Sequence, residues 1–294
     1  MRSFFSFPVV LGTALVVITL FTVRSRFHDP DTWWHLKTGQ VIVETGTIPR
    51  TDLFSYTTNQ HAWIAHEWLS QASLYGAYKL GGYRGLWVWL WGLASLLFVL
   101  LYVLCALYSG NAKVSLLGGL IGWFFGTVGL ALRPLILGHL FLVVELLILE
   151  LARARDRRWL WALPPLFAVW ANCHGSYALG LLVLSIVAGC SFVELRAGRL
   201  VSVRRERDER LRLCVVLAMS AAALLANPAG ARMLTYPINV FTRQTQSLMA
   251  IREWAPLSVT DPRGVGLFLL VGGIGLILLL RPAELRLEEV LLMV

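Results

Sequence analysis

Two aspartates close to the N-terminus have the type and spacing to support chemistry. Asp29 and Asp31 flank Pro30, which restricts the backbone between them, and His35 follows one helical turn later. Carboxylates this close can share a divalent cation such as Mg²⁺ or Mn²⁺, or one can act as general base while the other tunes its pKa. The alternative is that Asp31 only caps a helix, which leaves Asp29 and His35 without explanation.

Further candidates lie at distant positions in the sequence. An anionic phosphate or lipid headgroup could be bound by Arg133, His139, His174 and Arg252. His66 and Glu67 could bind a metal or assist proton transfer, although no second histidine follows at the HExxH spacing. Asn172 and Asn227 belong to two Ala-Asn-x-x-Gly sequences, where they could cap helices or line one shared pocket. Structural roles, such as an arginine reaching the lipid headgroups, remain open for all of them.

Composition excludes most classes of protein. Of 294 residues, 57% are hydrophobic and 15% charged, and the mean hydropathy is +0.67. A soluble domain has about a quarter charged residues, and a disordered chain has far less apolar content. The composition therefore predicts an integral membrane protein.

Eight apolar stretches could cross a bilayer, and the first has no cleavage site after it, so we interpret it as a retained signal anchor. They run over 4–23, 84–108, 114–132, 135–152, 159–173, 177–195, 213–227 and 264–280. Two short loops, 153–158 and 196–212, contain 11 of the 26 Lys and Arg residues and fall on one side if the spans alternate. The positive-inside rule makes that side, and the N-terminus, cytoplasmic at the cell (plasma or inner) membrane. The net charge of +9 is then a topology signal, and no nucleic-acid partner is expected.

The same topology places the polar candidates on the outer side. The segments 24–83 and 228–263 become the two large extracytoplasmic loops. In the first loop we expect two interfacial helices. The first, over 32–44, would have Asp31 as N-cap and stop at Thr45-Gly46, and its apolar side would include Trp33, Trp34 and Ile42. The second, over 65–80, would end at Gly81-Gly82. The expected fold is all-α, a polytopic transmembrane bundle forming a single membrane domain over 1–294.

Two further features follow from the spans. Glu145 would lie near the middle of the bilayer, where an ionised carboxylate is costly, so we expect it to be protonated or paired. The last residues, 290–294, read like the first turns of another span, and we expect the natural chain to continue.

Several of these motifs together resemble bacterial members of the GT-C glycosyltransferase superfamily. The motifs are Asp29-x-Asp31-x-Trp33-Trp34-His35, Gly46-Thr47-Ile48-Pro49, His66-Glu67-Trp68-Leu69, Arg133-Pro134, Trp170-Ala171-Asn172-x-His174-Gly175, Ala226-Asn227-Pro228 and Glu253-Trp254. The resemblance is strongest to the Rgt-like and dolichyl-phosphate-mannose mannosyltransferase-like branch and covers nearly the whole chain. The sequence lacks the Asp-Glu pair common in the protein-mannosylating and aminoarabinose branches.

The resemblance implies an inverting membrane enzyme that takes a sugar from a polyprenyl phosphate or pyrophosphate. Its acceptor would be a glycan, lipid or protein on the outer side, and Asp31, with Asp29 beside it, would be the base or a ligand of a divalent cation. Arg133, with His139, His174 or Arg252, would stabilise the leaving phosphate. Two other classes stay open: a lipid or lipid-linked-sugar transporter or binding protein without chemistry, and a scaffold whose outer loops dock a partner.

Overall fold

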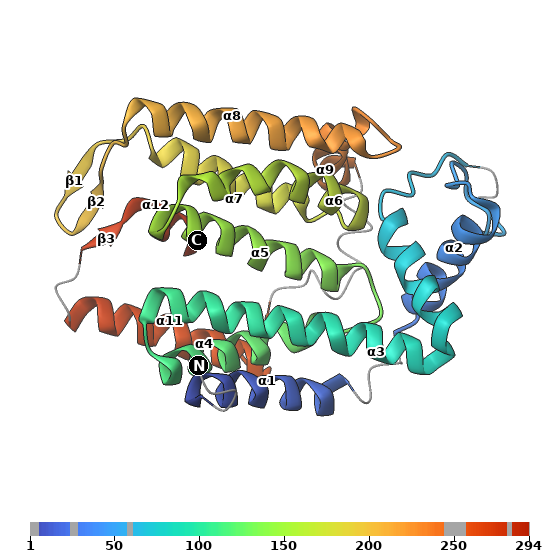
Figure 1. Cartoon of the computed structure of the whole chain (residues 1–294), viewed down its shortest axis with the longest axis horizontal. Helices are drawn as coiled ribbons and strands as arrows, with labels where there is room; N and C mark the ends of the chain where they lie inside the picture. Colours follow the sequence, from blue (N-terminus) through green and yellow to red (C-terminus); the bar gives the residue numbers. More distant parts are fainter. Residues whose placement is uncertain (1–5, 24–28, 58–60, 244–256, 281–283, 294) are drawn as a thin grey trace. The chain divides into compact units, whose positions relative to one another are not determined.

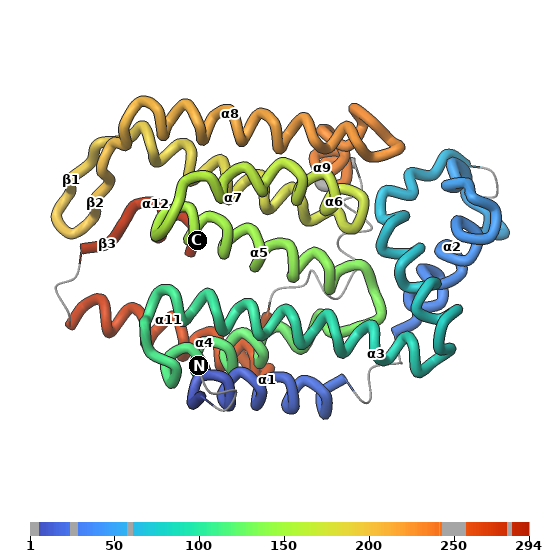
Figure 2. Tube along the Cα trace, viewed as in Figure 1, coloured from blue at the N-terminus to red at the C-terminus, as the bar shows by residue number. Residues whose placement is uncertain are grey.

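The computed structural model describes residues 6–23, 29–57, 61–243, 257–280 and 284–293. Figures 1 and 2 show a chain built almost entirely of helices. The helices are α1 (Phe7–Val23), α2 (Asp31–Thr45), α3 (Trp68–Ser109), α4 (Ala112–Gly126), α5 (Leu135–Ala154), α6 (Leu163–Cys173), α7 (Tyr177–Cys190), α8 (Arg207–Ala223), α9 (Arg232–Arg243), α11 (Pro262–Leu280) and α12 (Leu287–Met293). Short 3₁₀ helices are η1 (Thr127–Gly129), η2 (Arg157–Ala162) and η3 (Leu224–Ala226), and the strands are β1 (Leu195–Ala197), β2 (Leu200–Ser202) and β3 (Leu285–Arg286).

Within these residues, four helical segments are long and apolar enough to cross a membrane. They are α3, α4 continued by η1 (Ala112–Gly129), α5 and α11. The apolar helices α1 and α7 are shorter. Since a span needs about 20 apolar residues, these lengths indicate a membrane protein.

The third predicted span ends earlier than expected. α4 stops at Gly126 and its continuation η1 at Gly129, instead of at 132, and an irregular segment continues to Pro134. Tight turns satisfy its backbone, including N–H···O contacts from Ala131 to Gly129 (3.0 Å) and from Arg133 to Ala131 (2.8 Å). Leu130 and Leu132 are buried there, and irregular backbone at membrane depth is tolerated where protein surrounds it. Arg133 therefore follows a buried loop and not a helix.

Other predicted boundaries also shift for local reasons. The stretch 159–173 divides into η2 and α6, because Pro164 and Pro165 fit the first turn of a helix but not its interior. α8 begins at Arg207, six residues before the predicted span, so part of the basic loop is helical. The all-α prediction missed a small sheet, in which β1 pairs antiparallel with β2 around Gly198 (φ 59°) and β2 pairs parallel with β3.

The chain divides into two compact units, Met1–Leu179 with Ser220–Leu234, and Gly180–Met219 with Thr235–Val294. In the first unit α3 is central and is contacted by α1, α2, α4, α5 and α6. Its buried residues Leu86, Leu90 and Ala94 form the core together with Leu132 and Ile136. In the second unit Arg205 pairs with Glu209 (3.2 Å) and with Glu288 (2.5 Å), which ties β2, α8 and α12 together.

Both helices expected in the first loop are present. α2 ends at Gly46 (φ 67°), as predicted, and α3 begins at Trp68 instead of Ala65. Gly82 (φ 56°, ψ −139°) interrupts α3 where the second helix was expected to end, but the chain continues as helix beyond it. The break allows the first part of α3 to lie along α2 while the rest continues as an apolar helix. Trp33 and Trp34 are exposed as expected, whereas Ile42 is buried.

Glu145 is completely buried in α5. Among the described residues, neither of its carboxyl oxygens has a hydrogen-bond partner. Of the two expectations for Glu145, protonation or pairing, pairing is therefore not found among the described residues. An unpartnered polar group in this position costs about 1–3 kcal/mol, so Glu145 is a destabilising feature of the helix.

Close packing of α2 on α3 depends on Gly39. A Cβ at this position would lie 2.0 Å from the Gln71 carbonyl oxygen and 2.9 Å from the Tyr75 Cβ. We predict that Gly39→Ala destabilises the protein by about 1–3 kcal/mol, because backbone must move to admit the methyl group. Gly76→Ala, on α3 with nothing within 4 Å, is the matched control and should be neutral or stabilising by about 0.5–1 kcal/mol. Thermal unfolding in detergent measures both, and equal effects would contradict this account of the packing.

Candidate functional site

Arg133 connects the two aspartates of the first loop. Its Nη1 lies 3.3 Å from Asp29 Oδ2, and its Nη2 donates to Asp31 Oδ2. About a fifth of the Arg133 and Asp29 side chains is exposed, against half of the Asp31 side chain. The cluster thus joins the start of α5 to the start of α2, and Asp31 is its most accessible member.

The start of α2 differs from the prediction. Pro30 occupies the N-cap position, and Asp31 is the first helical residue instead of the cap. Asp29 performs the capping interaction, since its Oδ1 accepts the backbone N–H of Asp31 at 2.9 Å. The Asp31 carboxylate pairs with Arg133 instead of capping the helix.

The arrangement does not fit a divalent cation. The guanidinium of Arg133 contacts both carboxylates, where a cation held by Asp29 and Asp31 would have to lie. No group of three or more His, Cys, Asp or Glu side chains within the described residues could hold a metal ion. Mg²⁺ and Mn²⁺ prefer several oxygen ligands, so the expected metal role of the two aspartates finds no support in this geometry.

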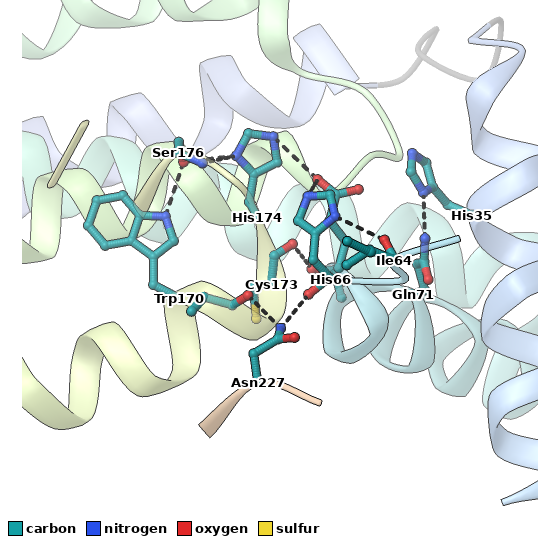
Figure 3. A network of polar contacts seen from close by, with 12 residues as sticks. His35, Ile64, His66, Gln71, Trp170, Cys173, His174, Ser176 and Asn227 are labelled. Carbon is teal, nitrogen blue, oxygen red and sulfur yellow. Dashed lines mark hydrogen bonds and ion pairs between the residues drawn. The ribbon is translucent and has the colours of Figure 1, made fainter. Parts of the chain in front are cut away.

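Glu67 lies between two histidines from different segments. Its Oε1 is 3.7 Å from Nε2 of His66 and 3.6 Å from Nε2 of His174. His174 follows α6, and Glu67 precedes α3, so the contact joins two distant parts of the sequence. Figure 3 shows His66 and His174 on neighbouring segments, each held by further polar contacts.

The position of His174 is set by Ser176 and Gly138. The Ser176 backbone N–H donates to His174 Nδ1 at 3.1 Å, and its Oγ lies 2.8 Å from the same nitrogen while accepting the Trp170 Nε1–H at 3.0 Å (Figure 3). A Cβ on Gly138 would lie 2.4 Å from Ser176 Oγ and 2.8 Å from His174 Nδ1. Only glycine at this position of α5 lets the turn after α6 approach so closely.

Burial controls the protonation of these groups. It lowers the pKa of His35 and of His66 to about 4 and that of His174 to about 3, and the positive charge of Arg133 also lowers those of His35 and His174. Burial raises the pKa of Glu67 to about 8, which the Arg133 charge opposes and the Asp31 charge reinforces. At neutral pH the three imidazoles are therefore uncharged, and Glu67 holds a proton.

The two asparagines act mainly as structural links. Asn227 Nδ2 donates to the carbonyls of His66 (3.1 Å) and Ala171 (2.9 Å), and its Oδ1 accepts the Ala229 N–H. Asn172 Oδ1 accepts the Trp68 Nε1–H at 2.5 Å. The capping interpretation is thus correct for Asn227, and both residues attach the segment before α3 to the ends of α6 and η3.

A pocket of about 570 Å³ lies beside these links. It is lined by residues 46–50, 62–65, 227–229 and Arg232. Of the two expected asparagines, only Asn227 lines it. Arg50 and Arg232 contribute positive charge, and Trp63 contributes an aromatic surface.

Sequence reasoning missed two residues of the site. Gln71 is buried on α3, and its Nε2 donates to Nδ1 of His35 at 3.2 Å (Figure 3). Ser176 orients His174. A signal existed for Gln71, because it lies four residues after Glu67 on the same helical face.

Most of the predicted site residues lie in the first unit. Direct contacts link Asp29 and Asp31 with Arg133, and Glu67 with His66 and His174, while electrostatic interactions connect His35 and Arg133 to both groups. His139 on α5 packs against Gly129, close enough to His174 to affect its pKa. Arg252 lies outside the described residues.

Acid should destabilise the protein through these histidines. A group whose folded pKa is lowered contributes stability above its unfolded value of 6.5, and that stability is lost as the pH falls towards about 4. We predict that Tm falls over this interval and that His35→Gln reduces the slope of Tm against pH. His61→Gln, at an exposed histidine of the first loop, is the control. Equal slopes in wild type and both variants, followed by differential scanning fluorimetry in detergent, would contradict the burial of neutral His35.

Comparison of the chain with protein-family models, with curated proteins and with solved structures finds no match. The resemblance to GT-C enzymes therefore rests on the motifs of the sequence, and the function has to be argued from the site.

Proposed function

We propose that this protein is an integral-membrane glycosyltransferase of the GT-C type. It would take a sugar from a polyprenyl phosphate or pyrophosphate and transfer it, with inversion, to an acceptor on the extracytoplasmic side of the cell membrane. The observation that carries the proposal is the meeting of Asp29, Asp31 and Arg133 beside Glu67 and His174, next to helices of membrane-spanning length. Acids, a guanidinium and neutral imidazoles at one place suit transfer from a phosphate leaving group.

In the proposed reaction, Asp31 is the general base. The acceptor oxygen forms a bond to the anomeric carbon, the bond between that carbon and the phosphate oxygen breaks, and its electron pair goes to the phosphate. The hydroxyl proton goes to Asp31, the more exposed of the two acids. Asp29 positions Asp31 through the backbone N–H at the start of α2.

Arg133 has the central electrostatic role in this scheme. In the free protein its guanidinium is bound to Asp29 and Asp31, which orients it and keeps it at the site. A donor phosphate would replace the contact with Asp31, and the released carboxylate would then be able to accept a proton. A guanidinium fits phosphate oxygens in a bidentate manner, and its interaction strengthens as charge develops on the leaving group.

The pocket beside Asn227 is our proposed binding site for the acceptor. Its size lies within the range typical of small-ligand sites, and it combines Trp63 with the polar Thr47, Arg50 and Arg232. Asn227 lines this pocket and also binds the His66 carbonyl, so an occupant would lie next to the segment that carries Glu67.

The proposed membrane topology has several spans and a cytoplasmic N-terminus. It follows from the arginine-rich loops 153–158 and 196–212 under the positive-inside rule. Membrane lipids would surround the apolar helices, and the polyprenyl chain of the donor would reach the site from the bilayer.

One observation favours a transporter as second candidate. The carboxyl of Glu145 on α5 is buried and has no hydrogen-bond partner within the part of the chain that the structure describes, and such a group can mark an ion or proton pathway. Flux of a lipid-linked sugar in proteoliposomes without bond formation, abolished in Glu145→Gln, would favour transport over transfer.

For the transferase we predict that Asp31→Asn lowers transfer from a radiolabelled polyprenyl-phosphate sugar by about 10²–10⁴-fold, because the amide cannot accept the hydroxyl proton. Asp208→Asn, at an exposed acid of α8, is the matched control and should leave the rate unchanged. Product is measured by extraction and scintillation counting. Transfer at the wild-type rate by Asp31→Asn would remove this residue from the role of base.

A further inference from the structure

The hydrogen-bond partners of His66 and His174 fix which nitrogen of each ring carries hydrogen. His66 Nδ1 lies 3.3 Å from the carbonyl oxygen of Ile64, which can only accept, so this nitrogen is the donor (Figure 3). His174 Nδ1 accepts the backbone N–H of Ser176, so its hydrogen resides on Nε2. The two neutral rings are therefore in opposite tautomers.

The opposite tautomers give the hydrogen bonds among His174, Glu67 and His66 one direction, from His174 to Glu67 and from Glu67 to His66. Nε2 of His174 donates towards Glu67 Oε1, and Nε2 of His66 offers a lone pair to the same oxygen. A protonated Glu67 satisfies both, because its O–H can donate to His66 while its lone pair accepts from His174. The distances of 3.6 and 3.7 Å exceed those of direct hydrogen bonds, and a small rotation of the Glu67 side chain or one water closes them.

Titratable groups from several elements surround Glu67. Among the described residues they are His66 on its own segment, His174 and the Cys173 thiol at the end of α6, Arg133 before α5, and Asp31 on α2. Arg133 acts electrostatically on Glu67 and on His174, so an anion bound to Arg133 would lie near both.

We propose that His66, Glu67 and His174 form a proton relay and that Glu67 gives its proton to the phosphate bound at Arg133. The inference rests on the proposed function. As the bond between the sugar and the phosphate breaks, the phosphate oxygen takes the electron pair and then the Glu67 proton, while Asp31 takes the proton of the acceptor hydroxyl. His174 then gives its Nε2 proton to Glu67 and is reprotonated by solvent, and solvent removes the proton from Asp31, so the protein ends each turnover unchanged.

The relay is tested by ¹⁵N NMR of the full chain labelled at histidine, in detergent at neutral pH. We expect His66 protonated on Nδ1 and His174 protonated on Nε2, with a carboxylic-acid infrared band that is lost as the pH rises through about 8 and is missing from Glu67→Gln. Glu67→Gln preserves the shape of the side chain and keeps one of its two histidine contacts, as donor to His66 or as acceptor from His174, so it should fold. The same tautomer for both rings, or an ionised Glu67 at neutral pH, would overturn the relay.

Delivery of the proton is tested with farnesyl phosphate as probe, followed by ³¹P NMR. We expect the phosphate bound to wild type to be protonated at pH 7, and the phosphate bound to Glu67→Gln to be a dianion. In the transfer assay Glu67→Gln should lose about 10²-fold in kcat. Glu289→Gln, at a partly exposed glutamate of α12, is the control.

The outcomes separate this inference from the function on which it rests. The same phosphate protonation in wild type and Glu67→Gln, or full transfer by Glu67→Gln, would overturn the role of Glu67 while leaving the transferase intact. If farnesyl phosphate does not bind to wild type at all, the delivery step and the proposed function fail together, whereas the tautomers of the relay are judged by the ¹⁵N result alone.

Discussion

The contact of Arg133 with Asp29 and Asp31 is the interaction on which the site depends. It brings the segment after α1 to the start of α5, although the residues are about a hundred positions apart in the sequence. Without the guanidinium, two carboxylates that flank a rigid proline would repel each other at the start of α2. With it, both acids are held in place and the only arginine within reach of Glu67 and His174 among the described residues is fixed beside them.

The rest of the first unit maintains this contact by close packing and polar links. Gly39 brings α2 against α3, and Gly138 admits the turn that carries His174. Asn227 joins the segment before α3 to α6 and η3 through two carbonyls. Gly39, Gly138 and Asn227 each fix the position of backbone segments. A small displacement of any one helix would therefore also move Glu67 and Asp31. Preorganisation of this kind is what transition-state stabilisation requires.

Of the eight apolar stretches predicted to cross the membrane, four correspond to described helical segments that are long and apolar enough to do so, because hydropathy depends on composition over about 20 residues and not on detail. The sequence also predicted the stop of α2 at Gly46, whereas the helix end expected at Gly81-Gly82 is a break inside α3. It failed where local turn chemistry decides, as at the start of α2, where Asp29 and not Asp31 satisfies the helix N–H, and in the loop before Arg133. Gln71 and Ser176 were missed because their importance lies in what they orient. The pairing of Arg133 with both acids required three-dimensional information, as did the tautomers of the two histidines.

The central claim is that Arg133 and its two acids form the binding site for a polyprenyl phosphate. Native mass spectrometry of the protein purified in mild detergent tests it most directly, by comparing wild type with Arg133→Gln. The account predicts a polyprenyl-phosphate or polyprenyl-pyrophosphate adduct on wild type that is lost from the variant, while adducts of ordinary phospholipids are the same for both. Equal retention of the polyprenyl lipid by both proteins, or ordinary phospholipids alone on wild type, would contradict it.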